Sequence, residues 1–173
     1  MGICYNWIVK ILIISDTHRS LKLAEQAIRR HLPADLLIHL GDFYADGKEL
    51  AEKIGIEFQG VRGNEDLLEG PNELEINLDG VKIFATHGHR YEIDSGLELI
   101  SSEAKERGAR LVLFGHTHKA GIYQKDGIWL LNPGNLFFAE REQSLGVIDT
   151  DGAGMVLSIF NFKQGGFSDV RKI

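Results

Sequence analysis

Seven residues whose side chains can bind metal ions lie in short polar motifs along the chain. They supply two carboxylates, one carboxamide and four imidazoles: Asp16, His18, Asp42, Asn64, His87, His116 and His118. These oxygen and nitrogen donors suit Mn²⁺, Zn²⁺, Fe²⁺, Ni²⁺ or Co²⁺ better than Ca²⁺. Seven ligands exceed one tetrahedral shell but suffice for two cations if one carboxylate bridges them. Because two cations about 3.5–4 Å apart can clamp the attacking and leaving oxygens of a phosphoryl displacement, the set predicts hydrolysis rather than metal storage.

Each candidate ligand follows a segment with the pattern of a buried strand. These segments are apolar and rich in β-branched residues, and they cover residues 9–15, 36–40, 56–61, 81–85 and 110–114. In open α/β sheets ligands collect at the carboxyl ends of strands, so we expect the seven side chains to converge. Gly41, Gly63, Gly88 and Gly115 each flank a candidate ligand, where the missing side chain permits close approach.

Helix and hairpin signals indicate how these strands are connected. Helices are predicted over residues 20–31, 46–54 and 95–108; Ser20 can cap the first, and Ser95 with Glu98 has capping-box spacing in the third. Three Asp-Gly pairs predict hairpins at residues 79–80, 126–127 and 151–152. Strand–helix units followed by antiparallel strands predict a layered α/β domain with helices outside the sheets.

The bulk composition favours one globular domain spanning residues 1–173. The chain is 43% hydrophobic and 25% charged, and residues 161–173 carry no strong signal, so we expect a loosely ordered tail there. A net charge of −6 gives no basic footprint, so nucleic acid is not an expected partner. The single Cys4 agrees with a reducing cytoplasm. The apolar run 7–14 is too short to span a membrane, so we expect neither a membrane partner nor a targeting segment.

Five motifs, in this order, resemble those of the calcineurin-like metallophosphoesterase superfamily. They are Asp16-x-His18, Gly41-Asp42, Gly63-Asn64, Thr86-His87-Gly88-His89 and Gly115-His116-Thr117-His118. The small size, together with Asn64-Glu65-Asp66 and Asn132-Pro133-Gly134, is most similar to the YfcE-type phosphodiesterase family. The resemblance spans most of the chain. It implies a four-layer α-β-β-α sandwich, in which two mixed β-sheets are flanked by helices.

The resemblance also implies how the ligands divide between two divalent metal ions, for which we favour Mn²⁺, with Ni²⁺, Zn²⁺, Fe²⁺, Co²⁺ or Mg²⁺ as alternatives. One ion would be held by Asp16, His18, Asp42 and His118, and the other by Asp42, Asn64, His87 and His116. Asp42 would then bridge the pair together with a hydroxide that attacks phosphorus in line. Water bound to a divalent ion can have its pKa lowered to about 7, so a nucleophile exists without a side-chain base.

Two positions depart from the family pattern. Glu65 stands where many members have a histidine that can protonate the leaving oxygen. Because free Glu has a pKa near 4.3 and free His near 6.5, His89 is the better candidate for this proton donor, and we count His89, Asn64 and Asp42 as catalytic residues. Asn135 stands where relatives often have Ser after Asn-Pro-Gly, and we expect the turn to remain intact.

Five further residues have ordinary structural explanations. His39 lies within a strand and is expected to support the core or the ligands, whereas His31 near a helix end is expected to be a surface cation. Arg62 is expected to form a structural salt bridge, Asp66 to support the Asn64 loop, and Tyr91 to pack.

Three functions remain in competition. The first is a cytoplasmic phosphoesterase, with a phosphodiesterase preferred, acting on a small phosphate ester. The second is a non-catalytic protein-binding scaffold, because the retromer subunit with this kind of fold is used for protein binding; such proteins typically have eroded ligands, and here all seven are present. The third is a metal-storage or regulatory binder. Homo-oligomerisation is left open.

Overall fold

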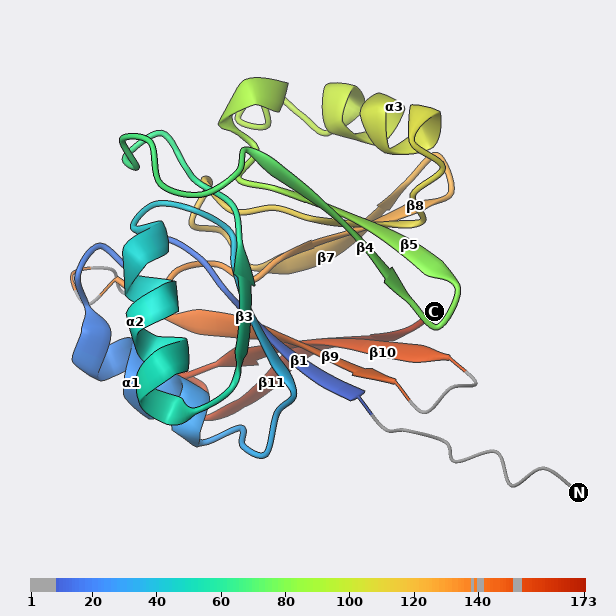
Figure 1. Cartoon of the computed structure of the whole chain (residues 1–173). Helices are drawn as coiled ribbons and strands as arrows, with labels where there is room; N and C mark the ends of the chain where they lie inside the picture. The colour runs from blue at the N-terminus through green and yellow to red at the C-terminus, as the bar shows by residue number, and fades with distance from the viewer. Residues whose placement is uncertain (1–8, 138, 140–141, 151–153) are drawn as a thin grey trace, which may run out of the picture.

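The computed structural model describes residues 9–137, 139, 142–150 and 154–173, and within them the strands form a six-stranded and a five-stranded sheet (Figure 1). The first sheet contains, in spatial order, β11 (Gly166–Lys172), β10 (Met155–Asn161), β9 (Ser144–Thr150), β1 (Val9–Ile14), β2 (Leu36–His39) and β3 (Glu57–Gly60). The second contains β4 (Glu73–Leu78), β5 (Val81–Thr86), β6 (Leu111–Leu113), β8 (Ile128–Asn132) and β7 (Gly121–Lys125). Both sheets mix parallel and antiparallel pairs.

Alternating side chains of the central strands divide the core into layers. Ile11 and Ile13 of β1 face the second sheet, whereas Leu12 and Ile14 pack with α1 (Leu21–Arg29) and α2 (Tyr44–Ile54). On the opposite side, the second sheet packs against α3 (Glu98–Glu106). Figure 1 shows these helices on the two outer faces of the sheets. The predicted four-layer sandwich of two mixed sheets is therefore confirmed.

The parallel strands deliver their carboxyl ends to one end of the sandwich. β1, β2 and β3 run parallel in the first sheet, and β5, β6 and β8 run parallel in the second. The predicted hairpins at Asp79-Gly80 and Asp126-Gly127 are confirmed, because both residues of each pair adopt the positive φ of a type I′ turn. The third Asp-Gly pair lies outside the described residues, although β9 and β10 on either side of it pair antiparallel.

Two boundary predictions were wrong. Ser95 does not open the third helix: its N–H donates to the carbonyl of Glu92, and α3 begins at Glu98. The expected loosely ordered tail instead contains β11, which pairs with β10 along its length. Its side chains are mostly exposed, so the strand is defined by backbone pairing and lacks a hydrophobic pattern.

His31 was also predicted wrongly, as a surface cation. Its ring lies 4.6 Å from that of Phe160 and 6.1 Å from that of Phe167, measured between centroids. Burial lowers the pKa of His31, so the side chain packs as a neutral ring.

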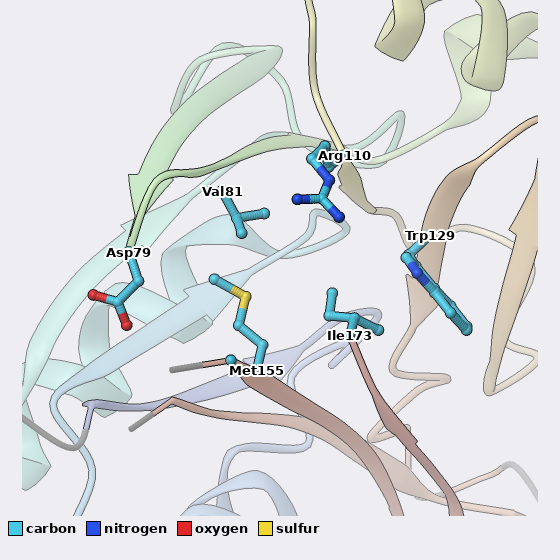
Figure 2. Close-up of a pocket in the computed structure, with 7 residues that line it drawn as sticks. Asp79, Val81, Arg110, Trp129, Met155 and Ile173 are labelled. Carbon is cyan, nitrogen blue, oxygen red and sulfur yellow. The ribbon is translucent and has the colours of Figure 1, made fainter. Parts of the chain in front are cut away.

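A cavity of about 220 Å³ lies at the amino ends of β5, β6 and β8 (Figure 2). Its lining includes Val81, Arg110, Trp129 and Met155. None of the seven candidate ligands lines it, because they follow the opposite ends of the parallel strands. Separately, none of the helices in the described part of the chain is long and apolar enough to cross a membrane.

Candidate metal centre

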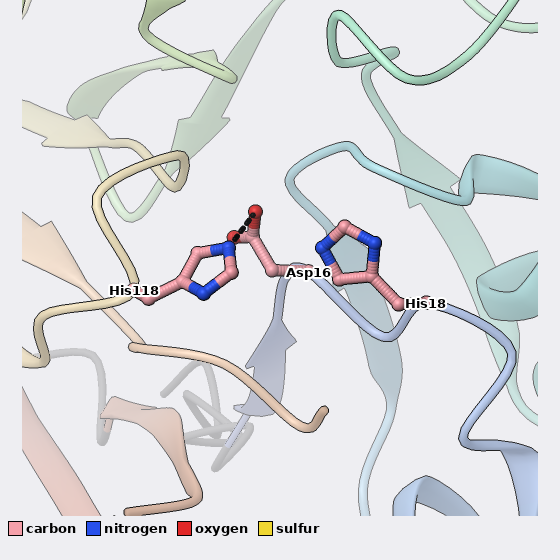
Figure 3. A group of neighbouring side chains, drawn as sticks. All are labelled: Asp16, His18 and His118. Carbon is pink, nitrogen blue, oxygen red and sulfur yellow. Dashed lines mark ion pairs between the residues drawn. The ribbon is translucent and has the colours of Figure 1, made fainter. Parts of the chain in front are cut away.

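Five of the seven predicted ligands form two groups of three, and both groups contain Asp16. Ligand atoms of Asp16, His18 and His118 lie within 4.8 Å of one another, and the same holds for Asp16, Asp42 and His87. Figure 3 shows the Asp16 carboxylate between the rings of His18 and His118. Its Oδ1 lies 3.2 Å from Nε2 of His118. Residues up to 102 positions apart in sequence are thus neighbours in space.

His116 joins the second group through its ring and its backbone. Its Nδ1 lies 3.3 Å from Nε2 of His87, and its N–H donates to Oδ2 of Asp16 at 3.2 Å. Asn64 is the exception among the seven. Asn64 directly follows Gly63, which lies beside Asp42. Its side chain is exposed and, within the described residues, makes no hydrogen bond to the other six candidate ligands.

The backbone of the ligand loops is conformationally unusual. Five candidate ligands have positive φ angles: Asp16 (53°), His18 (43°), Asp42 (56°), His116 (69°) and His118 (58°). Positive φ is uncommon outside glycine, and such strained residues cluster at binding and catalytic sites. This concentration supports a functional role for the loops independently of their side-chain chemistry.

Glycines allow the loops to approach one another. A Cβ on Gly63 would lie 2.1 Å from Oδ1 of Asp42, and one on Gly41 would lie 2.6 Å from Nδ1 of His87. Backbone hydrogen bonds then join the loops, from Asp16 N–H to the Gly41 carbonyl and from Gly115 N–H to the His87 carbonyl, both at 3.0 Å. The expectation that these glycines permit close approach is confirmed.

Two imidazoles are oriented by acceptors outside the ligand set. Nδ1 of His87 lies 2.7 Å from the Leu40 carbonyl, so this nitrogen donates and leaves Nε2 available toward Asp42. Nε2 of His116 lies 3.0 Å from Oδ2 of Asp94, which leaves Nδ1 available on the His87 side. A second-nitrogen hydrogen bond of this kind fixes the ring and the tautomer of a metal-binding histidine. Sequence reasoning missed Asp94, which no motif singled out.

A buried hydrogen-bond chain supports the loop that carries Asp16 and His18. Gly41 N–H donates to Nδ1 of His39, whose Nε2 therefore donates to the Thr17 hydroxyl at 3.1 Å. That hydroxyl donates to Oδ2 of the fully buried Asp46 at 2.8 Å, and Arg19 N–H donates to the same oxygen. His39 is therefore a supporting residue, as predicted, while Thr17 and Asp46 were missed.

The donor atoms fit a cation site. Asp16 Oδ1 and His18 Nε2 are buried and make no well-formed hydrogen bond within the described residues, although Oδ1 lies 3.2 Å from Nε2 of His118 and polar atoms at such depth normally have partners. The His18 ring is fixed between Phe43 and Phe137, with centroid distances of 5.2 and 5.0 Å. Unsatisfied oxygen and nitrogen donors aimed at one space are what a divalent cation would satisfy.

The charge state of the second group also suits cation binding. Burial alone would raise the pKa of Asp42, but the His87 imidazole and the Glu65 N–H outweigh burial and lower this pKa to about 2. Burial would lower the pKa of His87, but the carboxylates of Asp42 and Asp16 outweigh it and raise this pKa. The Asp42 carboxylate is thus ionised at neutral pH.

The remaining sequence predictions concern residues around the ligands. Asp66 supports the Asn64 loop as expected, because its carboxylate accepts the N–H groups of Tyr44 and Gly63. Tyr91 packs as expected, with its ring 5.8 Å from that of Phe84 and its hydroxyl on Glu73.

Two further predictions concern Arg62 and Asn135, whose side chains form hydrogen bonds near the ligand loops. Arg62 donates to the side-chain amide oxygen of Asn72, which corrects the expected salt bridge. Asn135 Nδ2 donates to the His118 carbonyl at 3.4 Å, and Asn135 Oδ1 accepts the N–H of Phe137, so the turn is intact and holds a ligand loop.

Solved structures similar to this one share the whole fold. Vacuolar protein sorting 29 from Cryptosporidium parvum superposes with a TM-score of 0.78 at 18% identity, covering 96% of this chain and 97% of that one. The phosphoesterase Yfce from E. coli superposes with a TM-score of 0.69 at 22% identity, covering 94% and 98%. At these identities the likeness concerns the fold alone.

Comparison of sequences identifies the family as well as the fold. The probable metallophosphoesterase YsnB of Bacillus subtilis is 33% identical over 130 residues, which cover 74% of this chain and 75% of that protein. The phosphodiesterase MJ0936 of Methanocaldococcus jannaschii is 27% identical over 163 residues, covering 83% and 94%. The family model described as "Calcineurin-like phosphoesterase superfamily domain" matches residues 9–153, which include every candidate ligand. The chain therefore belongs to the calcineurin-like phosphoesterase superfamily.

Proposed function

We propose that the chain is a metal-dependent phosphoesterase and that a phosphodiester of modest size is its preferred substrate. The observation that carries this proposal is the convergence of six candidate ligands at the carboxyl ends of the parallel strands. The similarity to a phosphodiesterase supports the preference for diesters. The net charge of −6 argues against a long nucleic acid, since binding to phosphate backbones relies on Lys and Arg.

We assign the ligands to two divalent cations, with Mn²⁺ as the expected ion. Asp16, His18, Asp42 and His118 would hold one, and Asp42, Asn64, His87 and His116 the other. When bound, the cations would polarise a phosphoryl oxygen and lower the pKa of coordinated water. The chain contributes the ionised Asp42 carboxylate as the shared ligand, and Leu40 and Asp94 hold the rings of His87 and His116. Asn64 would have to turn inward from its exposed position.

We assign protonation of the leaving oxygen to His89. Its ring centroid lies 5.4 Å from that of His87 and 6.2 Å from that of His116, beside the second ligand group. Its Nδ1 is buried and has no hydrogen-bond partner among the described residues. Burial, with His87 and His116, lowers the pKa of His89, so its imidazolium is a stronger acid, while a smaller fraction of the rings is protonated at neutral pH.

Replacing His89 by Ala tests this role, because only poor leaving groups need a proton. His89→Ala should slow hydrolysis of alkyl esters by about 100-fold, the lower end of general-acid effects, and should change hydrolysis of p-nitrophenyl esters little. Relative kcat/KM values for the two ester types measure the difference. Equal slowing of both would remove His89 from acid catalysis.

The direct test of the function is a screen of generic mono- and diesters. Metal-stripped protein would be assayed with Mn²⁺, Ni²⁺, Zn²⁺ or Mg²⁺ added, alongside Asp42→Asn and the matched control Asp126→Asn. Both aspartates have positive φ, which Asn tolerates, and Asp126 lies in the β7–β8 turn away from the ligands. We expect metal-dependent hydrolysis by the wild type and the control, and loss by at least about 100-fold in Asp42→Asn. Full activity in Asp42→Asn would contradict a bridging role.

A protein-binding scaffold is the second candidate, and one observation favours it. Leu67 and Leu68, on the loop after Asn64, are 94% and 83% exposed. Exposed apolar neighbours of this kind can mark a partner surface, and the fold is shared with vacuolar protein sorting 29. Absence of hydrolysis with every metal, together with a stable complex that Leu67→Ser disrupts, would reverse the ranking.

A further inference from the structure

A polar cavity of about 330 Å³ adjoins the candidate metal centre on the His118 side. His118 and Lys119 line one wall, and the β10–β11 turn lines the other through Asn161 and Gln164. His118 also lies 3.2 Å from Oδ1 of Asp16 in the first ligand group. An ester whose phosphate is held at the ligands must place its esterified group in adjacent space, and this cavity supplies such space.

Amide groups in the cavity have hydrogen-bonding capacity to spare. Asn161 is only 6% exposed; its Oδ1 accepts the N–H of Gln164 at 3.1 Å, whereas its Nδ2 makes no hydrogen bond within the described residues. The side-chain amide of the exposed Gln164 likewise makes no hydrogen bond in the described part of the chain. Both amides can therefore pair with a ligand or with water in the cavity.

The lining chemistry identifies the class of ligand. The amides offer both donors and acceptors, and the Ser168 hydroxyl, which donates to the Ile159 carbonyl at 3.5 Å, can accept. Such groups match hydroxyls, which donate and accept at once. Among the described residues, no aromatic side chain lines the cavity to stack on a flat base. Lys119 and Glu142 line the cavity, and Glu142 also lies 3.7 Å from Lys163, so charges of both signs are present and a neutral group can be accommodated. A volume of about 330 Å³ is at the lower end of small-ligand pockets.

A second cavity, of about 200 Å³, lies on the Asp94 side and has a different lining. Ile93, Leu97, Phe114 and Tyr123 give it a larger apolar share, although Asp94, Thr117 and Lys119 also line it, and Lys119 lines both cavities. A group rich in hydroxyls would leave more of its polar atoms unpaired there. The polar cavity is therefore the better match for such a group.

We propose that the cavity formed by Asn161, Gln164 and Ser168 binds a neutral polyol, a sugar or glycerol, that is esterified to the substrate phosphate. This proposal rests on the proposed phosphoesterase function and narrows its substrate class. The polyol hydroxyls accept from the two side-chain amides and donate to the Gln164 carbonyl oxygen. The second cavity is left for the leaving group.

Three p-nitrophenyl phosphodiesters with the same leaving group test the proposal: a glyceryl, a ribosyl and a methyl ester. In wild-type protein with Mn²⁺, we expect kcat/KM for a polyol ester to exceed that for the methyl ester by about tenfold, the effect of one or two hydrogen bonds. Whichever polyol ester is faster identifies the sugar or the glycerol. In Gln164→Met, which keeps the length but removes the amide, this ratio should fall about fivefold. Gln59→Met, an exposed site on the far edge strand β3, serves as the matched control.

The outcomes separate the two proposals. Equal rates for all three esters, or a ratio that Gln164→Met leaves unchanged, would overturn the polyol site while hydrolysis itself still stands. If no ester is hydrolysed, the proposed function fails, and NMR titration with glycerol phosphate then tests the polyol site by itself. Shifts of the Asn161 and Gln164 side-chain amides that methyl phosphate does not produce would support the site, and their absence would overturn it.

Discussion

Asp94 is a single residue outside the set of candidate ligands that we expect to support metal binding. Its carboxylate lies 3.0 Å from Nε2 of His116 and holds the ring so that Nδ1 faces His87. No sequence motif contains Asp94, and only the fold brings it to the loop of residues 115–118. The contact is partly open to water, because the Asp94 side chain is 70% exposed.

Removing this carboxylate should weaken metal binding without unfolding the protein. We expect Asp94→Ala to reduce Mn²⁺ affinity by about tenfold, at the lower end of the range for such supporting groups because of its exposure. Competition titration with a chelating dye measures the affinity, and Glu52→Ala, an exposed site on α2, is the control. Unchanged affinity in Asp94→Ala would mean that His116 is oriented without it.

At the scale of secondary-structure elements, the hydrogen-bond chain from Gly41 through His39 and Thr17 to Asp46 joins the ends of β1 and β2 to α2. Burial lowers the pKa of His39 to about 4, and the charges of Asp16, Asp66 and Asp46 only partly oppose this. The neutral ring is the form that accepts from Gly41 and donates to Thr17. Protonation of His39 would therefore break the support of the ligand loops.

This hydrogen-bond chain makes the metal-free protein sensitive to acid. The unfolded chain protonates His39 near pH 6.5 and the folded chain only near pH 4, so between these values the unfolded state binds more protons. The His39 contribution to the free energy of unfolding should fall as pH decreases from 6.5 to about 4, by about 3 kcal/mol at roughly 1.4 kcal/mol per pH unit. The raised pKa of His87 acts in the opposite direction, because its contribution is complete below pH 6.5 and is lost as pH rises.

NMR titration isolates His39 from the other histidines. Its ring signals should remain those of neutral imidazole down to about pH 4, while denaturant unfolding reports the loss of stability. Titration of His39 near pH 6.5 would contradict its role as a buried neutral link.

Burial explains which secondary-structure elements could be predicted from sequence. Central strands such as β1 and β6 are fully or largely buried, so their apolar runs and the polar residues that follow them were recognisable. β11 is an exposed edge strand whose pairing with β10 leaves no hydrophobic pattern, and it contributes Phe167 to the aromatic surroundings of His31. Capping-box spacing at Ser95 was misleading because the preceding turn already uses that N–H. The motifs singled out the candidate ligands, whereas Asp94, Thr17 and Asp46 depend on tertiary contacts.

At the scale of the whole molecule, the two sheets place their parallel strands so that loops from both meet at one end. Asp16 and Asp42 follow strands of the first sheet, and His87, His116 and His118 follow strands of the second. The core between the sheets, which includes Ile13, Leu40 and Leu113, fixes this meeting. Cations shared across the interface would bind the folded state and stabilise it, since the unfolded chain scatters the ligands.

Diffraction from crystals soaked in Mn²⁺, collected for anomalous signal, tests the two-cation centre most directly. We expect two peaks about 3.5–4 Å apart, one contacting Asp16, His18 and His118 and the other contacting His87, His116 and an inward-turned Asn64, with Asp42 between them. The Asp42→Asn protein should lose at least one peak. A single peak, or no peak among these side chains in wild-type crystals at saturating Mn²⁺, would contradict a dinuclear phosphoesterase.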